Sequence, residues 1–356
     1  MPDIITNSDE KRRLFSLFEN MKDKQGSGLN KTQNSDVLLV DFYNIFIRSF
    51  CAIPTLNSNG LHVGGIAGFL KTVGAAVKLL SPSRVIIVID GNGGSLKRRK
   101  IYPEYKNHRK TTIRLNRSYE DLSTAELEEE GLKKQMLRTI SYLDTLPVTT
   151  IAIDNVEADD VIAYAAVEHF KDKNVYIMSS DRDFLQLVDD RVKVWNPSKK
   201  KIYGCSEIFD EYGISCKNFI NYRILDGDVS DNIDGIKGCG LKTLKKCLPI
   251  LAEPKQYTLQ EIYNYCESHA GKYKLHTSIL ENKSKVERNF QLMQLSDTQI
   301  QSFSQLRIKE VLDKPVNKLN KMEFVRLVGV DGMRDSLQNC GVWVGEVWGR
   351  FNSFIQ

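Results

Sequence analysis

The chain has 356 residues, 41% hydrophobic and 27% charged, which is enough to bury the core of one large domain or of two smaller ones. Its net charge of +5 is too small to indicate a partner by itself, so the distribution of charge along the chain is more informative. We find no signal peptide and no apolar run long enough to span a membrane, and the seven cysteines show no C-x-x-C spacing. We therefore expect a protein of the reducing cytoplasm with no membrane partner.

Residues 1–35 are polar and are interrupted by Gly26 and Gly28. This composition is typical of a linker, so we predict a polar N-terminal arm. A short amphipathic helix is predicted within it, around residues 14–21.

From Val37 to about residue 205, apolar runs rich in β-branched residues alternate with segments of helical character. Segments 65–80 and 158–170 are predicted to be crossover helices, which is the pattern of a parallel sheet. We therefore predict an α/β domain over residues 36–215, with a central, mainly parallel sheet flanked by helices. Strand signals fade beyond it, and residues 216–356 are predicted to form a helical C-terminal domain.

A charged insertion at about residues 97–132 interrupts this pattern. Its basic half contains one acid, Glu104, and nine basic residues: Lys97, Arg98, Arg99, Lys100, Lys106, Arg109, Lys110, Arg114 and Arg117. Its second half is acidic. A charged run is ordinarily a solvated loop, but a long insertion between sheet elements is more often a functional lid. We predict that it covers a binding crevice.

Acidic residues recur where strands are predicted to end. Nine of them fall in five clusters: Asp41; Asp90; Glu157, Asp159 and Asp160; Asp181 and Asp183; Asp228 and Asp231. Helix capping or turn formation would explain one or two of these acids. It would not explain why all five clusters occupy the same kind of position. Ligands of open α/β sheets bind beyond the carboxyl ends of the strands. Carboxylates gathered there repel one another unless cations intervene, and oxygen ligands suit Mg²⁺ or Mn²⁺. We predict a metal site for phosphate chemistry.

Residues 233–244 have the form of a helix-hairpin-helix turn. Its glycines let the backbone approach a phosphate, and the following helix offers N–H groups at its start. Ordinary turns contain such glycines too, but the position directly after Asp228 and Asp231 favours function. Lysines add charge without reading bases, so we expect sequence-independent binding of nucleic acid. The residues expected to contact it are Gly235, Lys237, Gly238, Gly240 and Lys242.

Together these motifs resemble the 5′-nuclease (flap endonuclease) superfamily, above all the phage 5′→3′ exonucleases, which include the T-even phage ribonuclease H. The resemblance covers about residues 36–250 in order and spacing. It rests on Val40-Asp41, Ile89-Asp90-Gly91, residues 103–109, Val156 to Asp160, Ser180 to Asp183 and Gly227 to Asn232. It implies a PIN-like 5′-nuclease fold in which the insertion at 97–132 forms a helical arch.

The resemblance also implies a two-metal phosphodiesterase that leaves a 5′-phosphate and a 3′-hydroxyl. Two Mg²⁺ ions, for which Mn²⁺ could substitute, would activate a water and stabilise the leaving oxygen. The first ion would be held by Asp41, Asp90, Glu157, Asp159 and Asp181. The second would be served by Asp160, Asp183, Asp228 and Asp231. A K⁺ ion at the hairpin turn is a further candidate.

Other roles follow from the same resemblance. Lys106 and Arg109 would be catalytic residues that neutralise the scissile phosphate, and Arg48 would contact substrate phosphates. Tyr105 would stack on an unpaired base; the alternative is a core aromatic. Arg182 stands where phage relatives often have glycine, and this departure removes no predicted ligand.

We therefore expect a metal-dependent 5′→3′ exonuclease and flap endonuclease with ribonuclease H-type activity. Its substrates would be DNA and RNA–DNA duplexes with 5′ ends or flaps, such as RNA primers in replication. The alternatives are a non-catalytic junction-binding protein, against which the complete set of acids argues, and a PIN-type ribonuclease, which usually lacks arch and hairpin.

A monomer is expected, in the host cytoplasm if a phage encodes it. Candidate partners are a single-strand-binding protein and a sliding clamp. The apolar tail, residues 340–356, is either a docking peptide for such a partner or a segment that packs on the chain's own helical domain. The second alternative is favoured.

Overall fold

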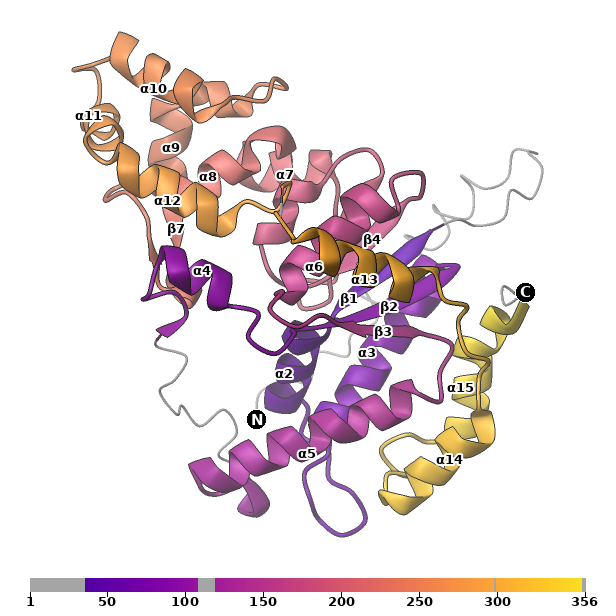
Figure 1. The fold of residues 1–356 in the computed structure, drawn as a ribbon. Coiled ribbons are helices and arrows are strands. Elements are labelled where there is room, and N and C mark those ends of the chain that lie inside the picture. The colour runs from indigo at the N-terminus through magenta and orange to yellow at the C-terminus, as the bar shows by residue number, and fades with distance from the viewer. Residues whose placement is uncertain (1–35, 108–118, 298, 354–356) are drawn as a thin grey trace, which may run out of the picture. The chain divides into compact units, whose positions relative to one another are not determined.

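The computed structural model describes residues 36–107, 119–297 and 299–353, and residues 36–356 group into one compact unit (Figure 1). The predicted N-terminal arm, residues 1–35, lies outside the described residues, and so does Arg109 within segment 108–118. Among the described helices, none is both long and apolar enough to cross a membrane.

A six-stranded sheet with the order β3-β2-β1-β4-β5-β6 forms the centre of this unit. Neighbouring strands from β3 to β5 are parallel, and the edge strand β6 is antiparallel to β5. The strands are β1 (Val37–Asp41), β2 (Arg84–Ile89), β3 (Thr149–Ala152), β4 (Val175–Met178), β5 (Val192–Asn196) and β6 (Lys201–Tyr203). The predicted α/β class with a mainly parallel sheet is therefore confirmed.

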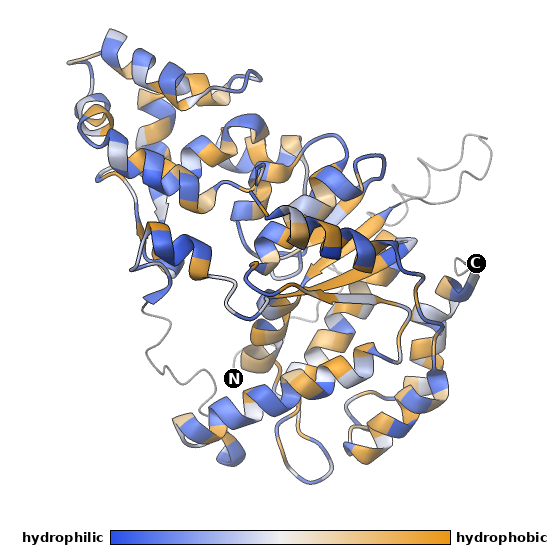
Figure 2. Ribbon diagram, viewed as in Figure 1, coloured by the Kyte–Doolittle hydropathy of each residue, from blue (hydrophilic) through white to orange (hydrophobic). Residues whose placement is uncertain are grey.

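The central strands are buried because helices cover both faces of the sheet. All five residues of β1 are buried. Leu38 and Val40 pack with one layer of helices, whereas Val37 and Leu39 pack with the other, as the two-residue period of a strand requires. Figure 2 shows the strands as predominantly hydrophobic. This burial on both faces explains why the sequence shows continuous apolar runs here.

The layer on the Leu38 face combines helices from the start and the end of the unit. They are α2 (Phe42–Ala52), α3 (Gly64–Leu80), α5 (Ala125–Leu143), α14 (Lys321–Val330) and α15 (Cys340–Trp348). Helix α3 confirms the crossover helix predicted at 65–80. Val344, Val347 and Trp348 are buried in this layer, so the described part of the tail packs on the folded chain.

The hydrophobic cluster on the Val37 face extends from the sheet through the helices that follow β6. These are α7 (Cys205–Tyr212), α8 (Phe219–Asp226), α9 (Leu241–Cys247), α10 (Leu259–Ser268), α11 (Lys274–Glu281), α12 (Lys283–Met293) and α13 (Ser302–Asp313). The same layer contains α6 (Ala158–Tyr164), which continues as a π-helix to His169 and covers the helix predicted at 158–170. A short antiparallel pair, β7 (Gly227–Asp228) and β8 (Ile233–Asp234), follows α8.

The C-terminal helices do not separate from the sheet as a compact unit of their own. Helix α13 contacts β3, and α14 and α15 return to the opposite face, where α15 contacts α3. The region beyond residue 215 is helical apart from β7 and β8, as predicted. It is nevertheless joined to the α/β core through both hydrophobic layers.

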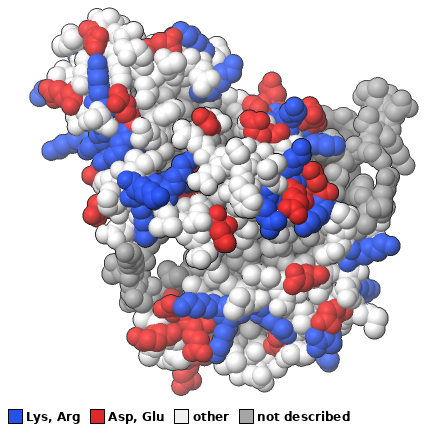
Figure 3. All heavy atoms as spheres, viewed as in Figure 1, with Lys and Arg blue, Asp and Glu red and all other residues white. Residues whose placement is uncertain are grey.

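Helices lie on both sides of segment 108–118 in the charged insertion. Helix α4 (Leu96–Ile101) precedes it, and a 3₁₀ turn (Glu120–Leu122) and α5 follow it. On the face shown in Figure 3, basic side chains gather in the region of α4, and acidic ones at the N-terminal end of α5 (Ala125–Leu143). The predicted reversal from basic to acidic charge is therefore present on the folded chain, whereas the arch itself depends on residues outside the described ones.

Two of the seven cysteines, Cys205 and Cys216, form a disulfide between the start of α7 and the turn before α8. The spacing of the cysteines in the sequence predicts dispersed, reduced thiols and gives no sign of this pair. Cys239, Cys247 and Cys266 are free and buried among apolar side chains.

Candidate active site

Asp41 and Asp90 lie at the carboxyl ends of the neighbouring strands β1 and β2. Asp41 is buried and caps α2, because its Oδ1 accepts a hydrogen bond from the backbone N–H of Asn44 at 3.2 Å. Its Oδ2 accepts one from the Ser179 hydroxyl at 2.9 Å. Asp90 is exposed and accepts a hydrogen bond from the backbone N–H of Ala158, at the start of α6, at 2.7 Å. The sheet and its crossover helices thus fix both carboxylates.

Asp41, Asp159 and Asp181 are close enough to affect one another's ionisation. Burial, reinforced by the charge of Asp183, raises the pKa of Asp181 to about 7. Burial is also the main reason that the pKa of Asp41 rises to about 6, with a contribution from Asp90. The pKa of Asp159 is raised well above its ordinary value by burial and then by the charges of Asp181 and Asp41. Without a cation, these acids therefore hold protons more tightly than solvated carboxylates do.

The chemistry of this donor set fits a divalent cation. All the donors are carboxylate oxygens, which Mg²⁺ and Mn²⁺ prefer, and a bound cation would relieve their repulsion. Among the described residues, however, no three Asp, Glu, His or Cys side chains converge into a preformed metal-binding group.

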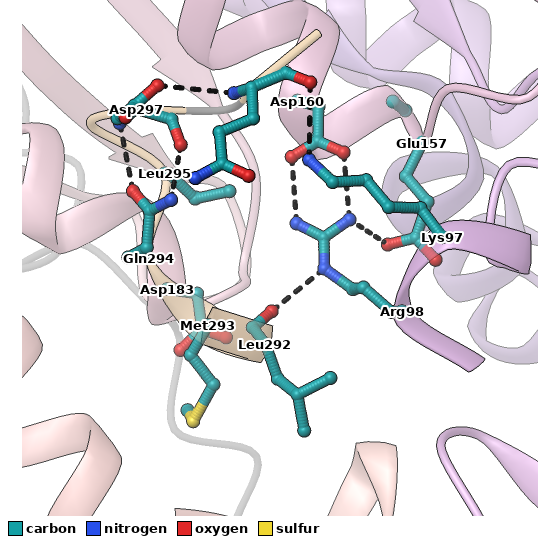
Figure 4. Close-up of polar contacts among 12 residues, drawn as sticks. Lys97, Arg98, Glu157, Asp160, Asp183, Leu292, Met293, Gln294, Leu295 and Asp297 are labelled. Atoms are coloured by element: carbon teal, nitrogen blue, oxygen red, sulfur yellow. Dashed lines mark hydrogen bonds and ion pairs between the residues drawn. The ribbon is translucent and has the colours of Figure 1, made fainter. Parts of the chain in front are cut away.

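Arg98 of α4 joins two of the predicted metal ligands (Figure 4). Its buried guanidinium donates to both carboxylate oxygens of Asp160, at 2.8 and 2.7 Å, and to Glu157 Oε2 at 2.9 Å. Its Nε donates to the carbonyl of Leu292, at the end of α12, at 2.8 Å. Burial alone would raise the pKa of Glu157, but Arg98 and Lys106 outweigh it and lower that pKa. Both oxygens of Asp160 are therefore engaged by an arginine here, and its predicted role at the second metal stays a prediction.

Lys106 lies among the acids, where a catalytic cation was expected. Its Nζ is 3.3 Å from Glu157 Oε2 and 3.8 Å from Asp231 Oδ2. The hydroxyl of Tyr105 lies 3.1 Å and 3.3 Å from the same two oxygens. Because Tyr105 is only 2% exposed, its ring is not free to stack on a base in this conformation. This burial favours the alternative of a core aromatic, and base stacking by Tyr105 stays a prediction.

A second buried arginine, Arg223 of α8, holds two more of the predicted ligands. Its side chain is fully buried, and it donates to Asp183 Oδ1 at 2.7 Å and to Asp228 Oδ2 at 2.5 Å. Burial alone would raise the pKa of Asp228, but hydrogen bonding from Ser230 and the charge of Arg223 lower it. The structure thus brings Asp183 and Asp228 together, as predicted, but around a protein cation.

The predicted hairpin turn follows β8 and presents lysines around a hollow. Gly235 is required by close packing, since a Cβ there would lie 2.1 Å from the carbonyl oxygen of Asp226. Gly238 has a φ of +82° and faces open space, and Gly240 precedes α9 as its N-cap. Beside Gly238 is a cavity of about 480 Å³, whose lining includes Lys237, Lys242, Lys246 and Lys274. Of the residues singled out from the sequence, Lys237, Gly238 and Lys242 line this cavity.

Sequence reasoning missed Arg98 and Arg223 as components of the site. Arg223 had a detectable signal, because it is a lone cation in the apolar segment 219–225. Arg98 had none, because it is one of four consecutive basic residues, 97–100, and only the fold shows which one is buried. Gln186 was also missed; its side chain donates to the carbonyls of Asp183 and Met293 and so joins the site to the end of α12.

Comparison with known proteins places this site in a family. The family model for the 5′-3′ exonuclease N-terminal resolvase-like domain matches residues 36–213. A 5′-3′ exonuclease of Aquifex aeolicus is 30% identical over 297 residues, which cover 82% of this chain and 93% of that protein. This chain belongs to the 5′-3′ exonuclease family. The DNA polymerase I of Deinococcus radiodurans is 33% identical over 67% of this chain, but the match spans only 22% of that polymerase.

Solved structures support the fold of this family member. The D15 protein of T5, co-crystallised with metal ions, matches with a TM-score of 0.60 at 20% identity. The match covers 78% of this chain and 98% of that protein. A second structure, of the bacteriophage T5 D15 flap endonuclease in a complex with DNA and metal ions, has a TM-score of 0.57 at 18% identity, over 83% and 99% of the two chains. At these identities the likeness concerns the fold.

We predict that Arg98→Ala destabilises the protein by about 3–5 kcal/mol, because it leaves Asp160 and Glu157 buried without their cation. Urea unfolding in EDTA measures the loss. Lys100→Ala, an exposed position on the same helix, is the matched control and should unfold with the parent midpoint. Equal midpoints for the two variants would show that the acids find another partner.

We also predict that stabilisation by Mg²⁺ increases with pH. The pKa values of Asp41 and Asp181, about 6 and about 7, lie above their ordinary value of 3.8. The folded metal-free protein therefore binds these protons more tightly than the unfolded chain does. That contribution is complete below about pH 4 and is lost as pH rises through about 6 to 7. A metal ion competes with these protons, so calorimetry should show a larger Mg²⁺-induced rise in Tm at about pH 8 than at about pH 5. A rise independent of pH would mean that Mg²⁺ binds elsewhere.

Proposed function

We propose that this protein is a divalent-metal-dependent 5′→3′ exonuclease and flap endonuclease. The observation that carries the proposal is the row of buried acids at the carboxyl edge of the sheet, with Lys106 held among them by Glu157 and Asp231. A binding module would gain nothing from buried acids that repel both one another and a phosphate backbone. An enzyme that places a cation between carboxylates and a phosphodiester uses them directly.

The residues that would hold the first metal ion are Asp41, Asp90, Glu157, Asp159 and Asp181. Asp160, Asp183, Asp228 and Asp231 would serve the second, after exchange of their arginine and lysine partners. Such ions supply an activated water and neutralise charge on the leaving oxygen. Mg²⁺ is the ion we propose, with Mn²⁺ as a substitute, because hard cations prefer these oxygen donors.

Lys106 would neutralise the phosphate undergoing cleavage. Its Nζ is within 4 Å of two acids, so a phosphate that reached these carboxylates would lie near this cation. Its backbone N–H donates to the carbonyl of Asp231, which anchors the base of the insertion at the site. Tyr105 keeps Glu157 and Asp231 in place through its hydroxyl. Arg109 would act with Lys106, although it lies outside the described residues.

The lysine-lined hollow at Gly238 would bind duplex through its phosphates. Its charge comes from lysines, which act as point charges and do not select bases. Binding should therefore be independent of sequence and should weaken steeply with salt. A K⁺ ion at this turn remains part of the proposal.

The finer assignments are extensions of the same proposal. They comprise activity on RNA–DNA hybrids and RNA primers, products with a 5′-phosphate and a 3′-hydroxyl, action as a monomer, and a cytoplasmic location. Support for nucleic acid as the partner comes from the structurally similar T5 flap endonuclease in complex with DNA and metal ions. A single-strand-binding protein or sliding clamp remains a candidate partner, but the buried side chains of α15 are not available to it.

The function is tested with a labelled 5′-flap, a nicked duplex and an RNA-primed duplex. We expect Mg²⁺-dependent cleavage from the 5′ side, abolished by EDTA. Lys106→Ala should lower turnover by roughly 100-fold or more, because the lysine would act on charge that develops in the transition state, while affinity for the flap in EDTA changes little. Binding of all three substrates without cleavage in Mg²⁺ or Mn²⁺ would instead identify a non-catalytic binding protein.

The hairpin assignment is tested with two glycines that have nearly the same backbone. Gly238 and Gly271 have φ values of +82° and +84°, and an added Cβ would meet no atom within 4 Å at either position. Valine should therefore strain the backbone similarly at both sites, but only Gly238→Val should also block the approach of a phosphate. We expect it to weaken nicked-duplex binding by about tenfold, with Gly271→Val near the parent. Equal affinities, measured by fluorescence anisotropy, would remove the hairpin from the binding surface.

A further inference from the structure

A separate cavity lies at the carboxyl edge of the sheet beyond Asp181. It has a volume of about 310 Å³ and lies between α2, the turn after β4 and the hairpin of β5 and β6. Small-molecule sites begin at roughly 300 Å³, so this cavity is of the size that one nucleotide needs. The strand order places Asp90, Asp41 and Asp181 along one edge, and the cavity continues that line past Asp181 toward β5.

The lining of the cavity includes two exposed arginines. Arg48 on α2 and Arg182 after β4 are both exposed, and neither guanidinium forms a hydrogen bond or ion pair with any residue that the structure describes. Asp181 is the acid in the lining, and its raised pKa reflects burial away from water. Two exposed guanidinium groups that line one cavity are suited to a phosphate, which they can bind with paired N–H donors.

The rest of the lining is ordered and partly apolar. The Oγ atoms of Ser180 and Ser198 lie 3.2 Å apart at the surface, and the Asn196 side chain accepts the backbone N–H groups of Ser198 and Lys199. Lys199 is itself engaged by Glu211 and Tyr203, so it forms part of the wall. Buried residues with apolar surface, such as Leu185 and Val194, also line the cavity. A lining that combines cations and hydroxyls with apolar groups suits a nucleotide, which combines a phosphate with a base.

We propose that this cavity binds one nucleotide of the substrate strand, with its phosphate between Arg48 and Arg182. The inference rests on the proposed function, because the nucleotide belongs to the same nucleic acid that reaches the acids. Lys106 is near Glu157 and Asp231, whereas the cavity begins at Asp181, so a strand along this edge would meet Lys106, the acids and the cavity in turn. The cavity fixes the register of the strand relative to the cleaved bond.

The test is a linkage scan on the labelled 5′-flap substrate. In each version one phosphate is replaced by an uncharged methylphosphonate, and KM and kcat are measured for the parent and for Arg182→Ala. We expect one linkage whose replacement raises the KM of the parent on the order of tenfold. Arg182→Ala should raise KM similarly, and replacement of that linkage should then have no further effect, because the two changes remove the same contact. Arg48→Ala should also raise KM, and replacement of the same linkage should then have no further effect on KM.

A matched variant distinguishes a phosphate contact in the cavity from a general loss of positive charge. Arg334→Ala removes an exposed arginine between α14 and α15, outside the cavity lining, and should leave the parent pattern unchanged. The proposal would be overturned if Arg182→Ala had the same KM as the parent, or if the linkage scan gave the same pattern in the parent and the variant. In either case, cleavage by the parent would still support the nuclease function. If a free deoxynucleoside 5′-monophosphate competes at the cavity but no linkage couples to Arg182, the cavity holds released product and the strand assignment is wrong.

Discussion

Charge repulsion at the carboxyl edge of the sheet is the constraint that the rest of this structure accommodates. Parallel strands that end side by side bring their terminal acids together, and burial makes each uncompensated negative charge costly. Two buried arginines relieve part of this cost: Arg98 pairs with Glu157 and Asp160, and Arg223 with Asp183 and Asp228. The remaining repulsion falls on Asp41, Asp159 and Asp181, whose pKa values are raised. A metal ion bound to these three acids would therefore relieve the largest remaining repulsion.

The features that could be predicted from the sequence were those that depend on local pattern. Residues 37–40 are apolar because both faces of β1 are buried. The strand, and the position of Asp41 at its end, could therefore be predicted from the sequence. The hairpin glycines and lysines are close together in the chain, and three of them, Lys237, Gly238 and Lys242, line one cavity in the fold. The family itself followed from the order of such segments, since each motif is short and local.

What could not be predicted depends on contacts between distant segments. Leu292 and Asp160 are far from Arg98 in sequence, and nothing in residues 97–100 shows which cation turns inward. The same holds for Tyr105. An aromatic residue beside basic residues in the sequence can either stack on a base or pack in the core, and its contacts with Glu157 and Asp231 are visible only in the fold. For the same reason, the sequence predicts only that the acids repel one another. Their protein counterions lie on helices whose packing the sequence does not reveal.

The end of α12 is joined to the acids at two points, through Arg98 to Leu292 and through Gln186 to Met293. Both links depend on residues that leave the ribosome long after the strands and their carboxylates have been made. A nascent chain that ends before residue 292 would contain every proposed metal ligand but not the carbonyls that orient Arg98 and Gln186. The maturation of the site during synthesis is therefore tied to completion of the C-terminal helices, which delays an ordered nuclease centre until most of the chain exists.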